Sequence, residues 1–370
     1  MRNVLVVSLC LVTTAHAGTV DTRLLWRSSE VDDGVVLGDL MRVDATASGV
    51  FVGYQAGFSV EVLWIDAEGS TSESVEIAGE APGHVNMPAA FDVAHDGSAF
   101  AVIGTMGSAR AAVRRPVFPP FDDVVNLDPV FDEPGMAQGH GVRFADGAVF
   151  TYVSQQPRRD MRRKQVRILR HDATNGEVTT IHAVEEADDD VENHFSSAIA
   201  WDWDVSPDGT VYVFDDYHSG TVAVFASDGT PGRRLELAVE IVRKSDETIE
   251  STRKSYEKFD AIPEIPRPEV LENFAAIATL STGGENGRLF AMSSAGMGKG
   301  RERVDRLHWW VVDTATGESL RREEIALPDG QWSVSDVVWF GDRIYVAGED
   351  ASRDGVPEIL CLQRVGSLSN

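Results

Sequence analysis

The sequence predicts an all-β protein, a six-bladed β-propeller in which a strand near the N-terminus completes the last blade. Three observations support this fold class. One stretch of the chain contains a complete four-stranded unit, its opening hairpin recurs six times, and one β-rich segment is left over at the beginning while the last unit lacks a strand. Four-stranded units repeated along a chain are typical of β-propellers.

The clearest unit spans residues 201–237. It contains four short β-rich runs, at 201–205, 211–214, 221–225 and 234–237, which polar turns separate. Asp208-Gly209 and Asp228-Gly229 lie in two of these turns. Asp-Gly between alternating apolar runs is a strong hairpin signal, because glycine adopts positive φ at little steric cost. We therefore expect a four-stranded meander.

The opening hairpin of this unit recurs with turns at Ser48-Gly49, Asp96-Gly97, Asp146-Gly147, Asp208-Gly209, Asn286-Gly287 and Gly341-Asp342. The turns are 48, 50, 62, 78 and 55 residues apart, and a blade of four strands takes about 40 to 50 residues. The longer intervals contain insertions. A pair of β-sandwiches would also give short strands with regular turns, but the repeat of blade length favours the propeller.

The two ends of the repeat region complement each other. The sixth unit contains β-rich runs at 333–340, 343–347 and 358–365 and then stops one strand short. Residues 22–27 (TRLLWR) form an unassigned β-rich run near the N-terminus. We predict that this run pairs with 358–365 as the outer strand of the last blade and so closes the ring.

The first 17 residues have the three parts of a secretory signal peptide. A positive start is followed by the apolar run 4–12 and by Ala15-His16-Ala17, which has small residues at the cleavage-defining positions. We expect cleavage after Ala17, a mature domain of residues 18–370, and a periplasmic or extracellular location. The apolar run is too short to span a bilayer. Cleavage would also leave Cys361 as the only cysteine, so we expect no intramolecular disulfide.

Charge excludes some partners. The chain carries 33 Lys and Arg against 59 Asp and Glu, a formal net charge of −26. Sequence-independent binding of nucleic acid requires a positive field. We therefore expect no nucleic-acid partner, and because no long apolar run follows the leader, no membrane span. We expect a monomer.

The run Tyr212-Val213-Phe214-Asp215, followed by Val222–Phe225 and Asp228-Gly229, resembles the NHL repeat of six-bladed propellers. The arginine that NHL repeats usually carry before the third strand is Thr221 here. Over about residues 40–365 the chain resembles a bacterial group of exported six-bladed propellers with TolB-like architecture and no assigned activity. The resemblance implies the fold, and a charged helix before the fifth blade, rather than an activity.

Two basic insertions are expected on the face where the chain enters each innermost strand, which we call the top face. Ligands of such folds usually lie there, because loops converge on the channel mouth. The basic residues are Arg158, Arg159, Arg162, Arg163 and Lys164 in one insertion, and Lys299, Arg301 and Arg303 in the other. They are candidate ligands for an anion or an acidic partner. Alternatively, both insertions are solvated loops.

A third insertion, at 239–274, contains an amphipathic pattern. Val242, Ile249, Thr252, Tyr256 and Phe259 form one apolar stripe, which predicts a helix over about 246–259. Ser245 is its expected N-cap. The helix is either a lid or docking element on the top face or a decoration packed on the propeller.

The chain contains no recognisable catalytic motif such as Gly-x-Ser-x-Gly, His-Glu-x-x-His or Cys-x-x-Cys. His84, His140 and His194 each precede an innermost strand and could together bind zinc. The resemblance supports this only in general terms, since peptidyl-hydroxyglycine lyases are six-bladed propellers with a three-histidine metal. Gluconolactonase-like propellers use a carboxylate and asparagines instead, for which Asn86, Asn193 and Asp202 are candidates. The acidic stretch 184–197 could bind calcium or form a solvated turn.

We therefore expect an exported, non-catalytic propeller without a cofactor. It would bind a protein, a polymer or a small ligand on its top face. The alternative is a metal-dependent lyase or hydrolase in which His84, His140 and His194 hold zinc or another divalent ion.

Overall fold

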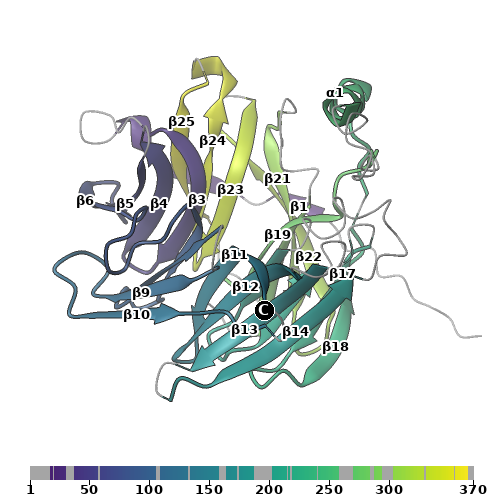
Figure 1. The fold of residues 1–370 in the computed structure, drawn as a ribbon. Coiled ribbons are helices and arrows are strands. Elements are labelled where there is room, and N and C mark those ends of the chain that lie inside the picture. Colours follow the sequence, from purple (N-terminus) through teal and green to yellow (C-terminus); the bar gives the residue numbers. More distant parts are fainter. Residues whose placement is uncertain are drawn as a thin grey trace, which may run out of the picture.

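The computed structural model shows a six-bladed β-propeller, in which six sheets of mainly antiparallel strands follow one another around a common centre (Figure 1). The structure describes residues 17–19, 21–30, 37–56, 59–105, 109–131, 134–157, 164–172, 175–186, 202–214, 216, 219–239, 241–257, 270–283, 287–293, 303–328, 331–353 and 355–365. Each sheet begins with an innermost strand, and the next three strands lie successively further out. The predicted fold class is confirmed.

The first three blades run from residue 39 to residue 186. Blade I consists of β3 (Asp39–Thr46), β4 (Gly49–Ala56), β5 (Ser59–Asp66) and β6 (Thr71–Glu76). Blade II consists of β7 (Pro88–Val93), β8 (Phe100–Gly104), β9 (Ala111–Arg115) and β10 (Asp123–Leu127). Blade III consists of β11 (Gly135–Ala145), β12 (Ala148–Pro157), β13 (Lys164–Asp172) and β14 (Val178–Glu186).

The other three blades use both ends of the chain. Blade IV consists of β15 (Asp202–Val205), β16 (Val211–Phe214), β17 (Thr221–Phe225) and β18 (Pro231–Glu236). Blade V consists of β19 (Ile277–Ser281), β20 (Arg288–Ser293), β21 (Arg306–Asp313), β22 (Ser319–Ala326) and, from the N-terminus, β1 (Ala17–Thr19). Blade VI consists of β23 (Trp332–Phe340), β24 (Arg343–Asp350), β25 (Pro357–Arg364) and β2 (Thr22–Arg27).

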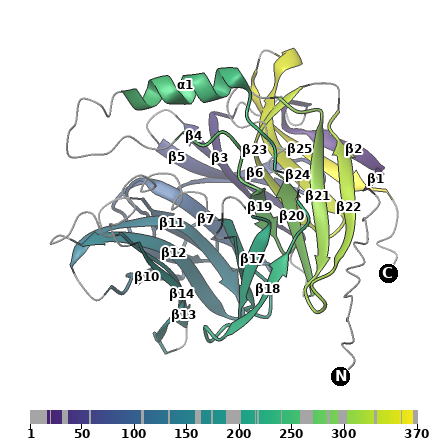
Figure 2. The same ribbon diagram turned by 90° about the vertical axis from the view of Figure 1, so that its right-hand side faces the viewer.

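The ring closes as predicted. Strand β2 pairs antiparallel with β25, from Thr22 opposite Arg364 to Arg27 opposite Leu360. Figure 2 shows this early part of the chain beside the last strands. The sequence did not predict β1, which adds a short parallel strand to the outer edge of blade V, with Gly18 opposite Glu323. An outer edge strand has unpaired backbone groups that can accept another strand.

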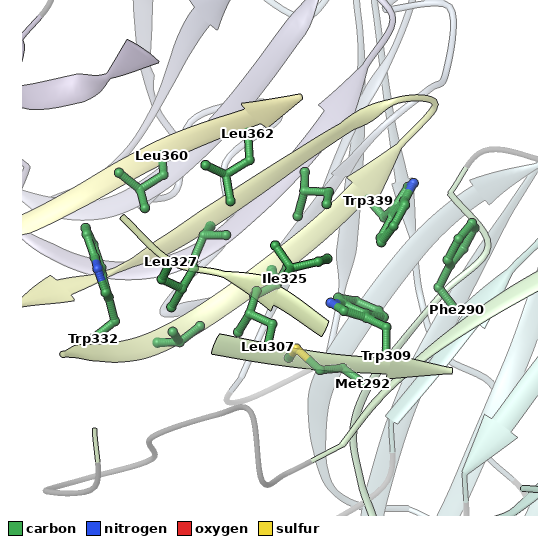
Figure 3. Packing of buried hydrophobic residues seen from close by; sticks show 14 of the residues in the cluster. Phe290, Met292, Leu307, Trp309, Ile325, Leu327, Trp332, Trp339, Leu360 and Leu362 are labelled. Atoms are coloured by element: carbon green, nitrogen blue, oxygen red, sulfur yellow. The ribbon is translucent and has the colours of Figure 1, made fainter. Parts of the chain in front are cut away.

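Hydrophobic side chains from neighbouring blades form the core. The largest cluster joins blades V and VI around Trp309, Trp332 and Trp339, each of which is almost fully buried (Figure 3). The ring of Phe290 stacks on that of Trp339 at 4.5 Å between centroids. Aromatic pairs of this kind contribute beyond the area that they bury. The blades are thus held together mainly by packing between sheet faces.

A buried ionic cluster lies where β2 ends on blade VI. Arg27 Nη1 is 3.7 Å from Asp350 Oδ2 and 3.8 Å from Glu358 Oε2, and all three side chains are at most 2 % exposed. The guanidinium of Arg27 also lies over the ring of Trp332, 5.8 Å from its centroid. The hydroxyl of Ser28 accepts a hydrogen bond from the Ile359 amide. The closing strand is therefore fixed by charge as well as by its backbone ladder.

The helix predicted before the fifth blade is present. Helix α1 (Asp246–Tyr256) begins after Ser245, whose side chain accepts a hydrogen bond from the Thr248 amide, and ends earlier than expected. Ile249, in the predicted stripe, is 3 % exposed. Figure 2 shows α1 as a separate rod outside the six sheets. Among the described residues, no helix is long and apolar enough to cross a membrane.

Candidate functional site

The innermost strands line an axial channel, and aspartates on these strands link consecutive blades. Asp44 of blade I accepts a hydrogen bond from the Val93 amide of blade II at 2.6 Å. Asp92 of blade II accepts one from the Phe144 amide of blade III at 2.6 Å. Each carboxylate therefore satisfies a backbone donor that the neighbouring sheet leaves unpaired, as buried amides require.

The same contact recurs further around the ring. Asp204 of blade IV accepts a hydrogen bond from the Thr282 amide of blade V at 2.6 Å, and Asp202 accepts one from the Leu280 amide. Asp336 of blade VI accepts one from the Val43 amide of blade I at 2.9 Å. At four junctions between blades, an aspartate carboxylate thus accepts a hydrogen bond from a backbone amide of the next blade.

Arg143 makes the link between blades III and IV. Its Nε donates to Asp204 Oδ1 at 2.7 Å, and its Nη1 lies 3.8 Å from Asp92 Oδ1. The guanidinium also lies over the ring of Trp203, 5.4 Å from the centroid. Burial alone would lower the pKa of Arg143, but Asp204 and Asp92 raise it overall, so this cation stays charged.

The channel contains more carboxylates than arginines. Burial raises the pKa of Asp44 and of Asp202, although arginines and amide hydrogen bonds oppose the shift. Burial raises the pKa of Asp92 well above its usual value, and the nearby charge of Asp44 raises it further. Desolvation and like charge both favour the neutral carboxyl.

The free space in the channel is small. The cavity among these side chains has a volume of about 50 Å³. That volume holds a few water molecules, whereas pockets for organic ligands have volumes of roughly 300 Å³ or more. Because the carboxylates are already engaged in joining blades, we interpret the channel as a structural element rather than as a substrate pocket.

A larger groove opens on the opposite face from the predicted site, where the innermost strand of each blade turns into the second strand. We call this the hairpin face. The groove has a volume of about 310 Å³ and lies between blades II and III. His95 and Phe144 line both this groove and the channel. The ring of His95 meets that of Phe340 edge-on, at 6.0 Å between centroids.

Most of the exposed large apolar side chains lie on the top face, in connections of several blades. Of the eight large hydrophobic residues that are exposed in the described part of the chain, five lie in or beside connections on that face: Met87, Val130, Met136, Ile241 and Val356. Met87 is 60 % exposed and Met136 is 48 % exposed. Apolar groups that face water on one side of a molecule often mark an interaction surface.

Most of the predicted basic residues lie outside the described residues, namely Arg158, Arg159, Arg162, Arg163, Lys299 and Arg301. Lys164 is the first residue of β13, and Arg303 is exposed just before β21. The first insertion is shorter than expected, because β12 continues to Pro157. The strands of blade III are accordingly longer than those of blades II and IV. Whether the two basic groups bind an anion stays a prediction.

The candidate metal ligands are only partly described. His84 lies in the connection before β7, with Nδ1 3.3 Å from the Pro82 carbonyl oxygen. His140 lies within β11 rather than before it, and its Nε2 is 2.8 Å from Ser154 Oγ. His194 is outside the described residues. The described part of the chain contains no cluster of three or more potential ligands with metal-binding geometry. Whether His84, His140 and His194 together bind a metal stays a prediction.

The other candidates from the sequence lie on different blades or outside the described residues. Asp202 is engaged with the Leu280 amide in the channel, whereas Asn86 lies in the connection before β7. Asn193 and most of the acidic stretch 184–197 are outside the described residues. Calcium binding by that stretch stays a prediction.

Sequence reasoning named Asp202 but missed the other channel aspartates and Arg143, although a signal for them exists. The opening strands contain Val43-Asp44-Ala45, Phe91-Asp92-Val93, Val142-Arg143-Phe144 and Trp203-Asp204-Val205, each with a charged residue between apolar neighbours. This charge recurs at one position of four innermost strands. A charged residue in a strand that must be buried indicates a specific partner.

Comparisons with known proteins show the fold alone. No family model matches the chain, and no curated protein matches it. A solved structure of a candidate exported protein from Bacteroides fragilis has a TM-score of 0.50 and 8% identity, covering 96% of this chain and 98% of that one. An aldose sugar dehydrogenase from Streptomyces coelicolor has a TM-score of 0.47 and 11% identity, covering 95% and 99%. A Trypanosoma rangeli sialidase has a TM-score of 0.49 and 12% identity, covering 89% and 54%. The Bacteroides fragilis structure thus shows a similarity in fold, and the comparison carries no further conclusion about activity.

Proposed function

We propose that the protein is an exported, non-catalytic propeller of the NHL or TolB-like kind that binds a partner, polymer or small ligand on its top face. The observation that carries this proposal is the distribution of exposed apolar side chains, most of which lie on that face. The signal-peptide pattern of residues 1–17 supports export. The small channel, in which Asp44, Asp92, Asp204 and Asp336 are engaged between blades, supports binding rather than turnover.

The two basic groups indicate that the proposed ligand is negatively charged. A protein with a net charge of −26 repels anions at long range, so a local positive rim would be needed to attract one. Arg303, which is exposed next to β21, lies on the top face because β20 and β21 are the second and third strands of blade V. We therefore propose an acidic polymer, either a polysaccharide or a peptide, as the ligand.

The test is a titration of oligogalacturonate and of polyglutamate against three proteins. The first is the wild type, and the second carries Lys299→Ser, Arg301→Ser and Arg303→Ser. The third carries Arg23→Ser, Arg233→Ser and Arg234→Ser, which removes three exposed positive charges from the outer strands β2 and β18. Loss of binding in the second protein alone supports the proposal. Equal binding by all three proteins, or no binding at low salt, contradicts it.

The metal-dependent alternative has its own measurement. Protein purified without a histidine tag would be analysed for zinc and calcium, beside a His140→Ala variant. Stoichiometric metal that this substitution removes would favour the enzyme, whereas a metal-free wild type that binds the acidic polymer would favour the binding protein.

A further inference from the structure

The groove between blades II and III is a separate feature on the hairpin face. It is bounded by the turn between β7 and β8, by the turn between β11 and β12, and by Pro207 from blade IV. Its volume of about 310 Å³ reaches the range in which proteins bind small organic molecules. In size it differs clearly from the axial channel, which has about 50 Å³.

The floor of the groove is largely apolar. Phe144, Ala145, Ala148 and Val149 contribute from blade III, and Ala99 contributes from blade II. Phe144 is partly exposed, so its ring offers a surface on which a flat apolar group can pack. A ligand for this groove would therefore have an apolar body.

The rim of the groove is acidic. Asp96 and Asp146 are exposed at the two hairpin turns that bound it. Hydrogen bonds from Ser98, including one from its amide to Asp96 Oδ1 at 2.9 Å, lower the pKa of Asp96 and keep this carboxyl ionised. The guanidinium of Arg115 also lines the groove, but it is paired with Asp123 Oδ2 at 3.0 Å.

Asp146 is held in place by the backbone. Its φ is 49°, in the left-handed region, and its amide donates a hydrogen bond to the Pro207 carbonyl at 3.2 Å. The backbone of this turn is therefore tied to blade IV. Asp96 and Asp146 thus line the groove from opposite turns, and the only arginine among the lining residues is already paired with a carboxylate.

We propose that this groove binds a small organic cation, with the ammonium group between Asp96 and Asp146 and the apolar body on Phe144. The acidic rim and the net charge of the whole chain, −26, both attract a cation and repel an anion. The site lies on the face opposite to the proposed polymer-binding face. Its occupation is therefore independent of the proposed function.

The experiment uses three probes of similar shape and different charge: phenethylammonium, 2-phenylethanol and 3-phenylpropionate. Each is titrated into ¹⁵N-labelled mature protein at low salt while the backbone amide signals are recorded. We expect phenethylammonium to shift the signals of Gly97, Ser98 and Gly147 in a saturable way, with weaker effects from the alcohol. The shifts should diminish at about 0.15 M salt, because exposed charges are then screened.

Matched variants test whether the carboxylates of Asp96 and Asp146 bind the ammonium group. Asp96→Asn with Asp146→Asn removes two charges and preserves both turns, since asparagine accepts the Ser98 amide bond and tolerates positive φ. The control, Asp66→Asn with Asp228→Asn, removes two turn carboxylates that do not line the groove. We expect the first pair to weaken phenethylammonium binding at least about tenfold and the control to change it little.

Three results would overturn the proposal. They are the absence of saturable shifts at millimolar phenethylammonium, tighter binding of 3-phenylpropionate, and equal affinity of the wild type and the Asp96/Asp146 variant. None of these results bears on whether the top face binds an acidic polymer.

Discussion

The buried ionic cluster that fixes the closing strand gives a sharp stability prediction. Replacing Arg27 by Met removes a guanidinium that is 1 % exposed and leaves Asp350 and Glu358, at most 2 % exposed, without their main counter-charge. Arg353 is the remaining cation nearby, with Nη1 4.0 Å from Glu358 Oε1, and its side chain is 41% exposed. Breaking a buried ion pair from one side costs about 3–5 kcal/mol. We expect the Arg27→Met variant to lose about that much unfolding free energy.

The assay is urea unfolding followed by tryptophan fluorescence, because Trp332 lies against Arg27. Arg306→Met is the matched control. Its guanidinium lies closer to a carboxylate, with Nη1 3.3 Å from Glu324 Oε2, but its side chain is 48% exposed. Exposed pairs contribute at most about 1 kcal/mol. A loss in Arg27→Met no larger than that in Arg306→Met would refute the reasoning.

A compensated variant separates charge from packing. Arg27→Met combined with Asp350→Asn and Glu358→Gln removes all three buried charges, and such replacements are often neutral or stabilising. We expect this triple variant to recover most of the lost free energy. If it is as unstable as Arg27→Met, the loss arises from packing around the long arginine side chain instead.

Three further predictions concern closure and pH. Deleting residues 18–30 removes β2 and should lower the melting temperature measured by circular dichroism, because the backbone hydrogen bonds with β25 are lost. An unchanged melting temperature would count against closure of the ring by β2. The raised pKa of Asp92 means that its contribution to stability is present at low pH and is lost as pH rises through the folded-state pKa. In urea unfolding, the Asp92→Asn variant should therefore have the same unfolding free energy as the wild type near pH 4 and a larger one at pH 8. The opposite trend would contradict a raised pKa of Asp92. Burial lowers the pKa of His171, whose Nε2 is 3.0 Å from Thr151 Oγ1, to about 4. Because the unfolded chain already binds this proton near pH 6.5, the free energy of unfolding should fall as the pH drops from 6.5 towards 4. An NMR titration that gives His171 an ordinary pKa would disprove this.

Local sequence determined much of the architecture. The hairpin turns with glycine predicted all six innermost strands, since positive φ at a turn is a local requirement. At Gly147, for example, φ is 66°. The run 22–27 matches β2 residue for residue, and Ser245 caps α1 as expected. These features depend on a few consecutive residues, so a single sequence carries them.

Lengths of elements were less predictable. The insertion that contains Arg158–Lys164 was expected to be a loop, but β12 extends to Pro157 and β13 begins at Lys164. Gln155 and Gln165, which look like loop residues, are 5 % and 3 % exposed within the tall blade III. Pairing with a neighbouring strand therefore decided their conformation in place of their own propensity.

The candidate sites depended on tertiary structure almost entirely. Strand periodicity assigns Asp44 to one face of β3, but it does not show that the Val93 amide, 49 residues later, lies within hydrogen-bond distance. In the same way, the groove exists because the turns at Asp96 and Asp146 belong to adjacent blades. The sequence by itself determined the strands, their turns and the closure of the ring, since these follow from short-range backbone preferences and the blade repeat. The tertiary structure alone decided which charges meet, because the twist and packing of separate sheets set the distances between them.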